Sequence, residues 1–453
     1  MSETPFITDF RALLAKHGIS APRFAYGASS FDPTKPKVLY SGPLFGADEI
    51  CAATSALVEG KWSVAGEHVH RFEMMFSKYL GQSESVAVNS GSSADLLMVA
   101  AAKARYDWPD GSGVLVSPCG FPTSISAITL NNLRPIFIDI EWETLNADNN
   151  EIERKLWDER AMASELGQDS QIKAILVSPV LGNPPDMDRI VSLAQQFNLK
   201  ILLDGCDSLG SKWRGEHLAS YATASTCSFF PSHHCSTIQG GMISSNDSDL
   251  ILRARQMSAW SRACHCTGAA NMLPNGVCGK RFSCWLPSCP DTIVDHKYVY
   301  VTDKAYNLQM PDLLGAIGCV QMDKLEDIHK ARRKAWTRLL FLTEQFLPDC
   351  DIVRMWAEYS DPSWFGFALI CPSYEYKTKL VSHLESAQIQ TRNYFAGNLL
   401  LHPGYSHLGR AEDYPNAQRV LKEVFFLGTN PGWTDPHFQH IEATLKAFVS
   451  PIL

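Results

Sequence analysis

Residues 173–204 read KAILVSPVLGNPPDMDRIVSLAQQFNLKILLD, and this stretch decides the fold. Two short apolar runs, Lys173–Ser178 and Lys200–Asp204, flank a segment, Met187–Phe197, whose apolar residues recur at helical spacing. The two runs are almost continuously apolar, which is typical of strands that are covered on both faces. The stretch therefore predicts a strand–helix–strand unit with parallel strands, and with it an α/β fold.

Further apolar runs on both sides of this unit predict a mostly parallel, seven-stranded sheet; they are Ser85–Asn89, Val114–Ser117, Pro135–Ile140, Thr226–Phe230 and Gly241–Ser244. From about Lys324, a charged helix pattern leads into a mixed segment that is typical of a smaller α+β domain. We expect an N-terminal arm with helices over 1–60, a large domain over 61–323 and a small C-terminal domain over 324–453. Residues 263–290 are rich in Cys, Gly, Asn and Pro and lack periodicity, which predicts an irregular loop with a function.

The composition is that of an ordinary soluble globular protein, with 453 residues, 45% hydrophobic residues, 19% charged residues and a net charge of −8. A negative charge gives no general attraction to nucleic acid or to anionic membranes. The first residues lack the pattern of a secretory signal, and the apolar runs are too short to span a membrane, so we expect a cytoplasmic protein. Thirteen cysteines, an odd number in such a chain, argue against disulfides and favour metal binding or burial.

A Gly/Ser-rich turn, Asn89–Ala94 (NSGSSA), follows one apolar run and opens a helix pattern. Small residues allow the backbone to approach an anion closely, and the amides and dipole at a helix N-terminus favour a phosphate. The same residue types are also ordinary helix caps, and the motif on its own does not separate the two interpretations. Gly91, Ser92 and Ser93 are the candidate phosphate-binding residues.

A second group of polar residues follows two later strands. Asp204 ends one apolar run, where the carboxyl edge of a parallel sheet meets ligands, and SFFPSHH (228–234) follows the next run, before Gln239-Gly240-Gly241. This arrangement resembles the DegT/DnrJ/EryC1 sugar aminotransferase family of pyridoxal phosphate enzymes, which implies an aspartate-aminotransferase-type (fold type I) large domain. In that family an Asp pairs with the pyridine nitrogen, and a Lys about as far downstream as His233 holds the cofactor covalently.

This chain lacks that lysine, and His233 stands in its place. Between Asp204 and Lys280 the only lysine is Lys212, which is too close to Asp204 to fill the role. The substitution is similar to that in the 3-dehydrases that act on nucleotide-linked 4-keto-6-deoxy sugars. Because an imidazole cannot hold the cofactor covalently, the resemblance implies noncovalently bound pyridoxamine 5′-phosphate (PMP), with His233 free to act as a general base near neutral pH.

The same resemblance implies roles for further residues. Phe121 matches the aromatic residue that stacks on the cofactor ring, with a core Phe as the alternative. Asp207 is expected near the ring hydroxyl, and Ser228 matches a phosphate ligand. Asn307 matches a residue that reaches the phosphate of the neighbouring subunit's cofactor, which implies a homodimer with shared active sites. The expected substrate contacts are Asn183, His234, Arg392 and Asn398.

Four cysteines form a C-x57-C-x-C-x11-C series: Cys206, Cys264, Cys266 and Cys278. Thiolates are the usual ligands of iron–sulfur clusters. The Cys-x-Cys and Cys-Gly-Lys-Arg-Phe segments are similar to those of the family that dehydrates CDP-4-keto-6-deoxyglucose, which implies a [2Fe-2S] cluster. The last spacing is about four residues longer here, at little cost in free energy, so Cys284 and Cys289 are alternatives to Cys278 as the fourth ligand. Zinc and unliganded core thiols are the competing interpretations.

The resemblance as a whole implies removal of the C3 hydroxyl of a nucleotide-linked 4-keto-6-deoxyhexose, with electrons supplied to the cluster by a reductase or ferredoxin. Two departures bear on the substrate: Gln239 replaces an acidic residue of the family, and Cys235 replaces an aliphatic one. The alternatives are a cluster-free dehydratase of the same fold, a sugar aminotransferase, and a non-catalytic iron–sulfur sensor. The sequence identifies neither the nucleotide, nor the sugar stereochemistry, nor the reductase.

Overall fold

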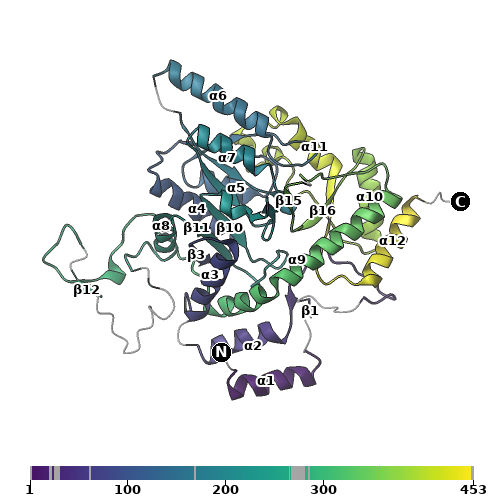
Figure 1. Cartoon of the computed structure of the whole chain (residues 1–453), viewed down its shortest axis with the longest axis horizontal. Coiled ribbons are helices and arrows are strands. Elements are labelled where there is room, and N and C mark those ends of the chain that lie inside the picture. The colour runs from purple at the N-terminus through teal and green to yellow at the C-terminus, as the bar shows by residue number, and fades with distance from the viewer. Residues whose placement is uncertain are drawn as a thin grey trace.

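A seven-stranded sheet forms the centre of the large domain in the computed structural model, which describes residues 3–19, 23–24, 31–60, 63–167, 170–264, 266, 281–283, 286–356 and 358–449 (Figure 1). Its strands are, in spatial order, β3 (Glu84–Val88), β11 (Gly241–Ser245), β10 (Ala224–Ser228), β7 (Lys200–Asp204), β6 (Ile172–Val177), β4 (Gly113–Val116) and β5 (Arg134–Phe137). β11 pairs antiparallel with both β10 and β3, and the other pairings are parallel. The expected mostly parallel sheet is confirmed.

Alternate residues of the central strands enter two different cores, which explains why these strands are continuously apolar. On β4, Val114 and Val116 pack on one side of the sheet, whereas Leu115 packs on the other. The helices of the first core are α4 (Gly91–Arg105), α5 (Pro122–Thr129) and α8 (Ser248–Ser258), and those of the second are α6 (Asn149–Glu165) and α7 (Met187–Gln196).

An antiparallel sheet forms the small domain, in the order β14 (Asp351–Ile352), β16 (Gly366–Ile370), β18 (Val424–Gly428) and β17 (Thr391–Asn393). Helices α10 (Tyr374–Ser386), α11 (Pro415–Glu423) and α12 (Asp435–Val449) accompany it. The 35-residue helix α9 (Asp312–Phe346) connects the domains. It packs against α2 (Ala47–Val58) and α3 (Glu67–Leu80) near its start, and its last turns enter the core of the small domain (Figure 1).

Shorter elements complete the described chain: α1 (Pro5–Lys16), which packs on α2, and the strand pairs β1 (Arg23–Phe24) with β2 (Leu44–Phe45) and β12 (Phe282–Ser283) with β13 (Val294–Asp295). β8 (Lys212–Trp213), β9 (Glu216–His217) and β15 (Ser360–Asp361) form a small third sheet. β12 lies apart from the main body, beyond α8 (Figure 1). No helix of the described residues is long and apolar enough to cross a membrane.

Candidate active site

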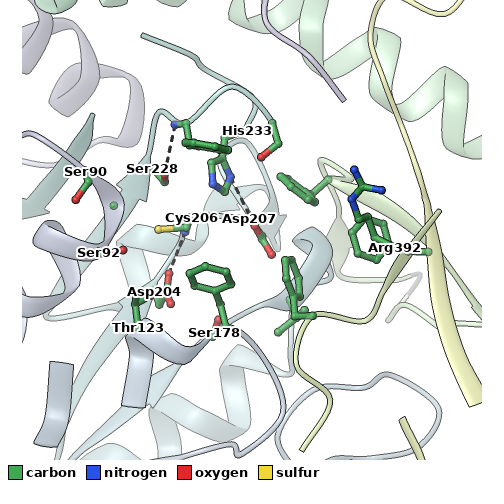
Figure 2. A pocket seen from close by; sticks show the side chains of 18 of the residues that line it. Ser90, Ser92, Thr123, Ser178, Asp204, Cys206, Asp207, Ser228, His233 and Arg392 are labelled. Atoms are coloured by element: carbon green, nitrogen blue, oxygen red, sulfur yellow. Dashed lines mark hydrogen bonds and ion pairs between the residues drawn. The ribbon is translucent and has the colours of Figure 1, made fainter. Parts of the chain in front are cut away.

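A cavity of about 680 Å³ opens at the carboxyl edge of the large sheet (Figure 2). Residues that follow five of the strands line it: Ser90 after β3, Phe121 after β4, Ser178 after β6, Cys206 after β7 and Phe230 after β10. Parallel strands end at the same edge of a sheet, and crevices at this edge are where ligands bind in α/β folds. The small domain closes the cavity with Phe365, Arg392, Asn393, Phe395 and Phe426.

Gly91 lets the N-terminus of α4 pack closely against Ser228 and Cys206. Ser90 caps the helix, because its hydroxyl accepts from the amide of Ser93 (3.1 Å). A Cβ atom on Gly91 would lie 2.5 Å from Cβ of Ser228 and 3.2 Å from Sγ of Cys206, so no side chain fits at position 91 unless Ser228 moves. Small residues and a helix N-terminus therefore meet here, as an anion site requires.

The structure places the residues of the Gly/Ser turn in two different settings. Gly91 and Ser92 line the cavity, as expected of phosphate ligands. Ser93 does not line it: its amide binds Ser90, and its hydroxyl accepts from the Ser90 hydroxyl (2.9 Å). In this structure Ser93 thus takes part in the helix cap.

Asp204 is a buried acid at the end of β7. The Ser124 hydroxyl donates to its Oδ2 atom (2.6 Å), and the Cys206 amide donates to its Oδ1 atom (3.3 Å). Asp95 of α4 lies beside it, is fully buried, and accepts from the Thr226 hydroxyl (2.6 Å). Burial, and then the nearby Asp204, raise the pKa of Asp95 well above its ordinary value. Sequence reasoning missed Asp95, because an acid within a helix carries no distinguishing signal.

His233 lies in the loop between β10 and β11, and its side chain points into the cavity beside Asp207 (Figure 2). Its Nδ1 atom is 3.6 Å from Oδ1 of Asp207 and has no hydrogen-bond partner in the described chain. Burial, and then the guanidinium of Arg332, lower the pKa of His233 to about 3, while burial, and then Asp204, raise the pKa of Asp207 to about 7. The contact therefore joins a neutral imidazole to a partly protonated carboxyl.

Arg332 of α9 holds the backbone of the loop that carries His233. Its side chain is buried, and Nη2 donates to the carbonyl oxygens of Ser232 (2.9 Å) and His233 (3.2 Å). Nη1 donates to the carbonyl oxygen of Phe365 (3.2 Å), so the same guanidinium also fixes the start of the small domain's wall. Sequence reasoning missed this residue, because it lies in a charged helix pattern that is typical of an exposed face.

The wall opposite the sheet edge is aromatic and carries one cation. The Arg392 guanidinium stacks over the ring of Tyr40 at 4.1 Å, and Arg392 lies across the cavity from Ser90 and Ser92 (Figure 2). Phe121 is 51% exposed, and its ring meets that of Phe395 edge-on at 6.0 Å. Arg392 thus lies where a substrate contact was expected.

Three of the expected substrate contacts do not line the cavity in this structure. The side chains of Asn183, His234 and Asn398 are all buried, and each hydrogen-bonds to main-chain carbonyl groups. These bonds run from Asn183 to Thr144 (3.0 Å) and Arg354 (2.9 Å), from His234 to Ser363 (2.9 Å) and from Asn398 to Ala411 (3.1 Å). Their role in this structure is to brace the loops around the site.

Asn307 is exposed, and its backbone forms an isolated antiparallel β-bridge with that of Ala259. It does not line the cavity of its own chain. Its expected contact with a neighbouring subunit stays a prediction.

The expected cluster ligands are not gathered within the described residues. Sγ of Cys206 lies within 4.8 Å of carboxylate oxygens of Asp95 and Asp204, and no other thiol of the described chain joins this group. Burial, and then the charge of Asp204, raise the pKa of the Cys206 thiol well above its ordinary value. Cys264 is half-buried, Cys266 and Cys289 are exposed, and Cys278 and Cys284 lie outside the described residues. The described chain therefore presents one of the expected thiols at the cavity.

Comparison with known proteins relates this geometry to a family. Residues 45–446 match the model of the DegT/DnrJ/EryC1/StrS aminotransferase family. The chain is 31% identical to dTDP-4-dehydro-2,6-dideoxy-D-glucose 3-dehydratase of Saccharopolyspora spinosa, over 95% of this chain and 89% of that protein. It is 29% identical to the lipopolysaccharide biosynthesis protein RfbH of Salmonella typhimurium, over 98% of this chain and 97% of that protein.

A similar solved structure confirms the expected fold. This is GDP-4-keto-6-deoxy-D-mannose-3-dehydratase of E coli with bound hydrated PLP, with a TM-score of 0.75 and 26% identity. The match covers 90% of this chain and 100% of that one. The large domain thus has the aspartate-aminotransferase-type (fold type I) architecture that the motifs predicted.

Proposed function

This chain is an enzyme of the DegT/DnrJ/EryC1/StrS aminotransferase family, and from this premise we propose that it removes the C3 hydroxyl of a nucleotide-linked 4-keto-6-deoxyhexose, with PMP as its cofactor. One observation carries the proposal: His233 lines the cavity, and none of the described residues around the cavity is a lysine. An aminotransferase of this fold needs a lysine there to bind its cofactor covalently. The relatives named 3-dehydratases support the same reaction class.

The residues of the cavity fit this cofactor. Gly91, Ser92 and Ser228, which line the cavity at the N-terminus of α4, would bind its phosphate. The exposed ring of Phe121 would cover one face of the pyridine ring, and Asp204 would pair with the ring nitrogen. When bound, PMP supplies an amine that condenses with a sugar ketone and a ring that delocalises negative charge.

His233 would move the protons of the reaction. Its neutral imidazole, whose Nδ1 atom makes no hydrogen bond within the described chain, can accept a proton at that nitrogen and return it to the departing C3 hydroxyl, which leaves as water. Asp207, 3.6 Å away, would steady the imidazolium formed in between. Arg332 holds the loop of His233 in position through its bonds to two main-chain carbonyl groups. Phe365 and Phe395 line the cavity and would exclude water from it.

We further propose a [2Fe-2S] cluster as the source of electrons, since replacing C–OH by C–H requires two electrons. The support is the thiol series itself, together with the position of Cys206 at the cavity. A reductase or ferredoxin would be the electron donor. In the cluster-free alternative, glutamate returns the amine and supplies the same two electrons.

Iron content separates these two routes. The protein would be purified without oxygen, assayed for iron and sulfide, and its visible spectrum recorded before and after dithionite. A brown protein that bleaches on reduction supports the cluster. An iron-free protein that turns over with glutamate establishes the cluster-free route.

The homodimer with shared active sites also remains part of the proposal. It predicts a dimer in sedimentation equilibrium and weaker PMP binding in Asn307→Ala, whose side chain is exposed in the single chain. A monomer that binds PMP fully would remove Asn307 from the site.

The reaction itself is tested with purified protein, PMP and the CDP-, TDP- and GDP-linked 4-keto-6-deoxyhexoses. The expected product is lighter than the substrate by one oxygen atom and forms only with a source of electrons. His233→Asn serves as the control and should form none. A product that keeps its C3 hydroxyl and gains an amine would show a sugar aminotransferase instead.

A further inference from the structure

Two cysteines outside the cavity face one another in the small domain. β14 pairs antiparallel with β16, with Asp351 opposite Ile370 and Ile352 opposite Leu369. One step beyond the end of this ladder, the same register places Cys350 opposite Cys371. Directly opposed side chains lie on the same face of a sheet, and both thiols belong to the core of the small domain.

The backbone around Cys371 shows which kind of pair this is. The Cys371 amide donates to the carbonyl oxygen of Glu423 (2.8 Å), which continues the pairing of β16 with β18, on the side away from β14. In an antiparallel sheet the N–H and C=O groups of one residue point to the same side, so Cys371 presents no main-chain bond to Cys350. The two residues thus form a non-hydrogen-bonded pair, whose Cα atoms typically lie about 4.5 Å apart, within the range that a disulfide spans.

The surroundings favour reaction between the two thiols. Their mutual hydrogen bond lowers the pKa of Cys350 and raises that of Cys371, and a hydrogen bond with Tyr376 also lowers that of Cys350. β14 is the edge strand of its sheet, and Cys350 is the more exposed of the two, at 8% against 1%. Lys377 is buried close by, and its ammonium group donates to the carbonyl oxygen of Leu421 (2.8 Å). Cys350 is therefore the thiol that a small oxidant reaches first.

We propose that Cys350 and Cys371 form a redox-reactive dithiol that closes to a disulfide by exchange with a low-molecular-weight disulfide such as oxidised glutathione. The Cys350 thiolate attacks the oxidant, the S–S bond of the oxidant breaks, and one thiol leaves. Cys371 then loses its proton and attacks the mixed disulfide, so that the Cys350–Cys371 bond forms and a second thiol leaves. Two thiols of the protein are oxidised, and one disulfide is reduced to two thiols.

Formation of the Cys350–Cys371 disulfide would couple the elements around the cavity to the redox state of the surrounding solution. β14 follows directly on α9, the helix whose Arg332 holds the carbonyl groups of Ser232 and His233. β16 begins at the residue after Phe365, which lines the cavity. The disulfide would tie the segment between this helix and β14 to the far end of β16, the strand that begins beside the cavity. The proposal does not depend on the proposed function, because it concerns residues outside the cavity.

The test uses the full-length wild-type protein in buffers with increasing ratios of oxidised to reduced glutathione, followed by acid quenching, unfolding, alkylation and tryptic digestion. Trypsin places each of these cysteines alone in its peptide, 339–354 and 355–377. The expected result is a disulfide-linked pair of these peptides that accumulates under oxidising buffers and disappears with dithiothreitol. Peptide 38–61 is the internal control and should stay alkylated, because its one cysteine, Cys51, is 2% exposed and packs in a cluster that contains no other cysteine of the described chain.

Two outcomes would overturn the proposal. One is that both peptides stay alkylated in the most oxidising buffer. The other is that each carries glutathione without a link between them. In Cys371→Ser the linked pair should be absent, and Cys350 should instead carry glutathione. The oxidised wild type should also melt at a higher temperature than the reduced form, because the link restricts the unfolded chain, whereas Cys371→Ser should show no such rise.

Discussion

The guanidinium of Arg332 donates to the main-chain carbonyl oxygen of His233 (Nη2–O 3.2 Å), so a residue of α9 sets the position of the proposed base. The bonds run to the backbone, which leaves the imidazole free to face the cavity. The loop between β10 and β11 is therefore held in place by a helix that is not part of the sheet.

Replacing Arg332 with Lys should lower activity more than substrate binding. A lysine has one compact ammonium group and cannot serve carbonyl groups on two loops at once. We expect a loss of about 2 kcal/mol of stability, a marked fall in kcat and a nearly unchanged KM for the sugar nucleotide. Arg333→Lys is the matched control, because this neighbouring guanidinium binds the Pro362 carbonyl at the surface. Equal losses in both variants would show that α9 does not tolerate lysine in place of arginine in general, and that the contacts of Arg332 have no special role.

Replacing His233 with Lys should convert noncovalent into covalent cofactor binding. With PLP, we expect a mass increase that survives denaturation after borohydride treatment, and a fall in dehydration on the order of 100-fold or more, since the general base is lost. His233→Asn is the control and should bind PLP without a covalent bond. A lysine variant that still dehydrates at the wild-type rate would remove His233 from its proposed role.

Replacing Gly91 with Ala should displace Ser228 and so disrupt the proposed phosphate site. The added Cβ would lie 2.5 Å from Cβ of Ser228, so we expect PMP affinity to fall and stability to drop by about 1–3 kcal/mol. Equilibrium dialysis with PMP and with inorganic phosphate measures the first effect, and thermal unfolding measures the second. Gly404→Ala is the control, because a Cβ there meets nothing within 4 Å. Undiminished PMP binding by Gly91→Ala would place the phosphate elsewhere.

Acid should destabilise the protein through His329. This imidazole contacts the Tyr79 hydroxyl (Nε2–O 3.0 Å) and the Ser363 hydroxyl (Nδ1–O 2.5 Å), and burial, followed by Arg333, lowers its pKa from 6.5 to about 3. The folded state keeps it neutral while the unfolded chain protonates it. Its contribution to stability is therefore present above about pH 6.5 and is lost as the pH falls toward 3, by about 2 kcal/mol at pH 5.

His329→Gln isolates this effect. The variant should be less stable than the wild type by about 1 kcal/mol near pH 7.5, where it loses hydrogen bonds. The difference should shrink or reverse near pH 5, where the wild type carries the cost of a buried titratable ring. Urea unfolding at both pH values measures it, and His407→Gln, at an exposed position, serves as the control. A pH-independent difference would contradict the assignment.

The residues that follow strands of the large sheet were predictable from sequence. Asp204, Asp207 and Ser228 come directly after or at the end of apolar runs, and parallel strands bring such positions to one edge. Local pattern therefore carried three-dimensional information. The resemblance added what these patterns cannot supply, namely that position 233 is the one where a lysine is expected.

The opposite wall could not be predicted in this way. Its residues come from distant parts of the chain and meet only through tertiary packing, as do Tyr40, Arg332 and Phe426. No spacing in the sequence therefore predicts them. Asn183 and Asn398 show a second limit of sequence motifs. Both lie in segments that resemble the family, but a motif does not say whether an amide faces a ligand or a carbonyl group, and here both bind carbonyl groups.

β11 runs against its neighbours, and this reversal bears on how the scaffold can evolve. Because the chain turns back directly from β10 into β11, residues 229–240 stay at the carboxyl edge and cross neither face of the sheet. A substitution at position 233 leaves the pairing of Ser228 with Gly241 and both helical layers in place. With the proposed role of His233, a single substitution there would exchange noncovalent for covalent cofactor binding. A lineage can explore new reactions on this scaffold without first losing a stable fold.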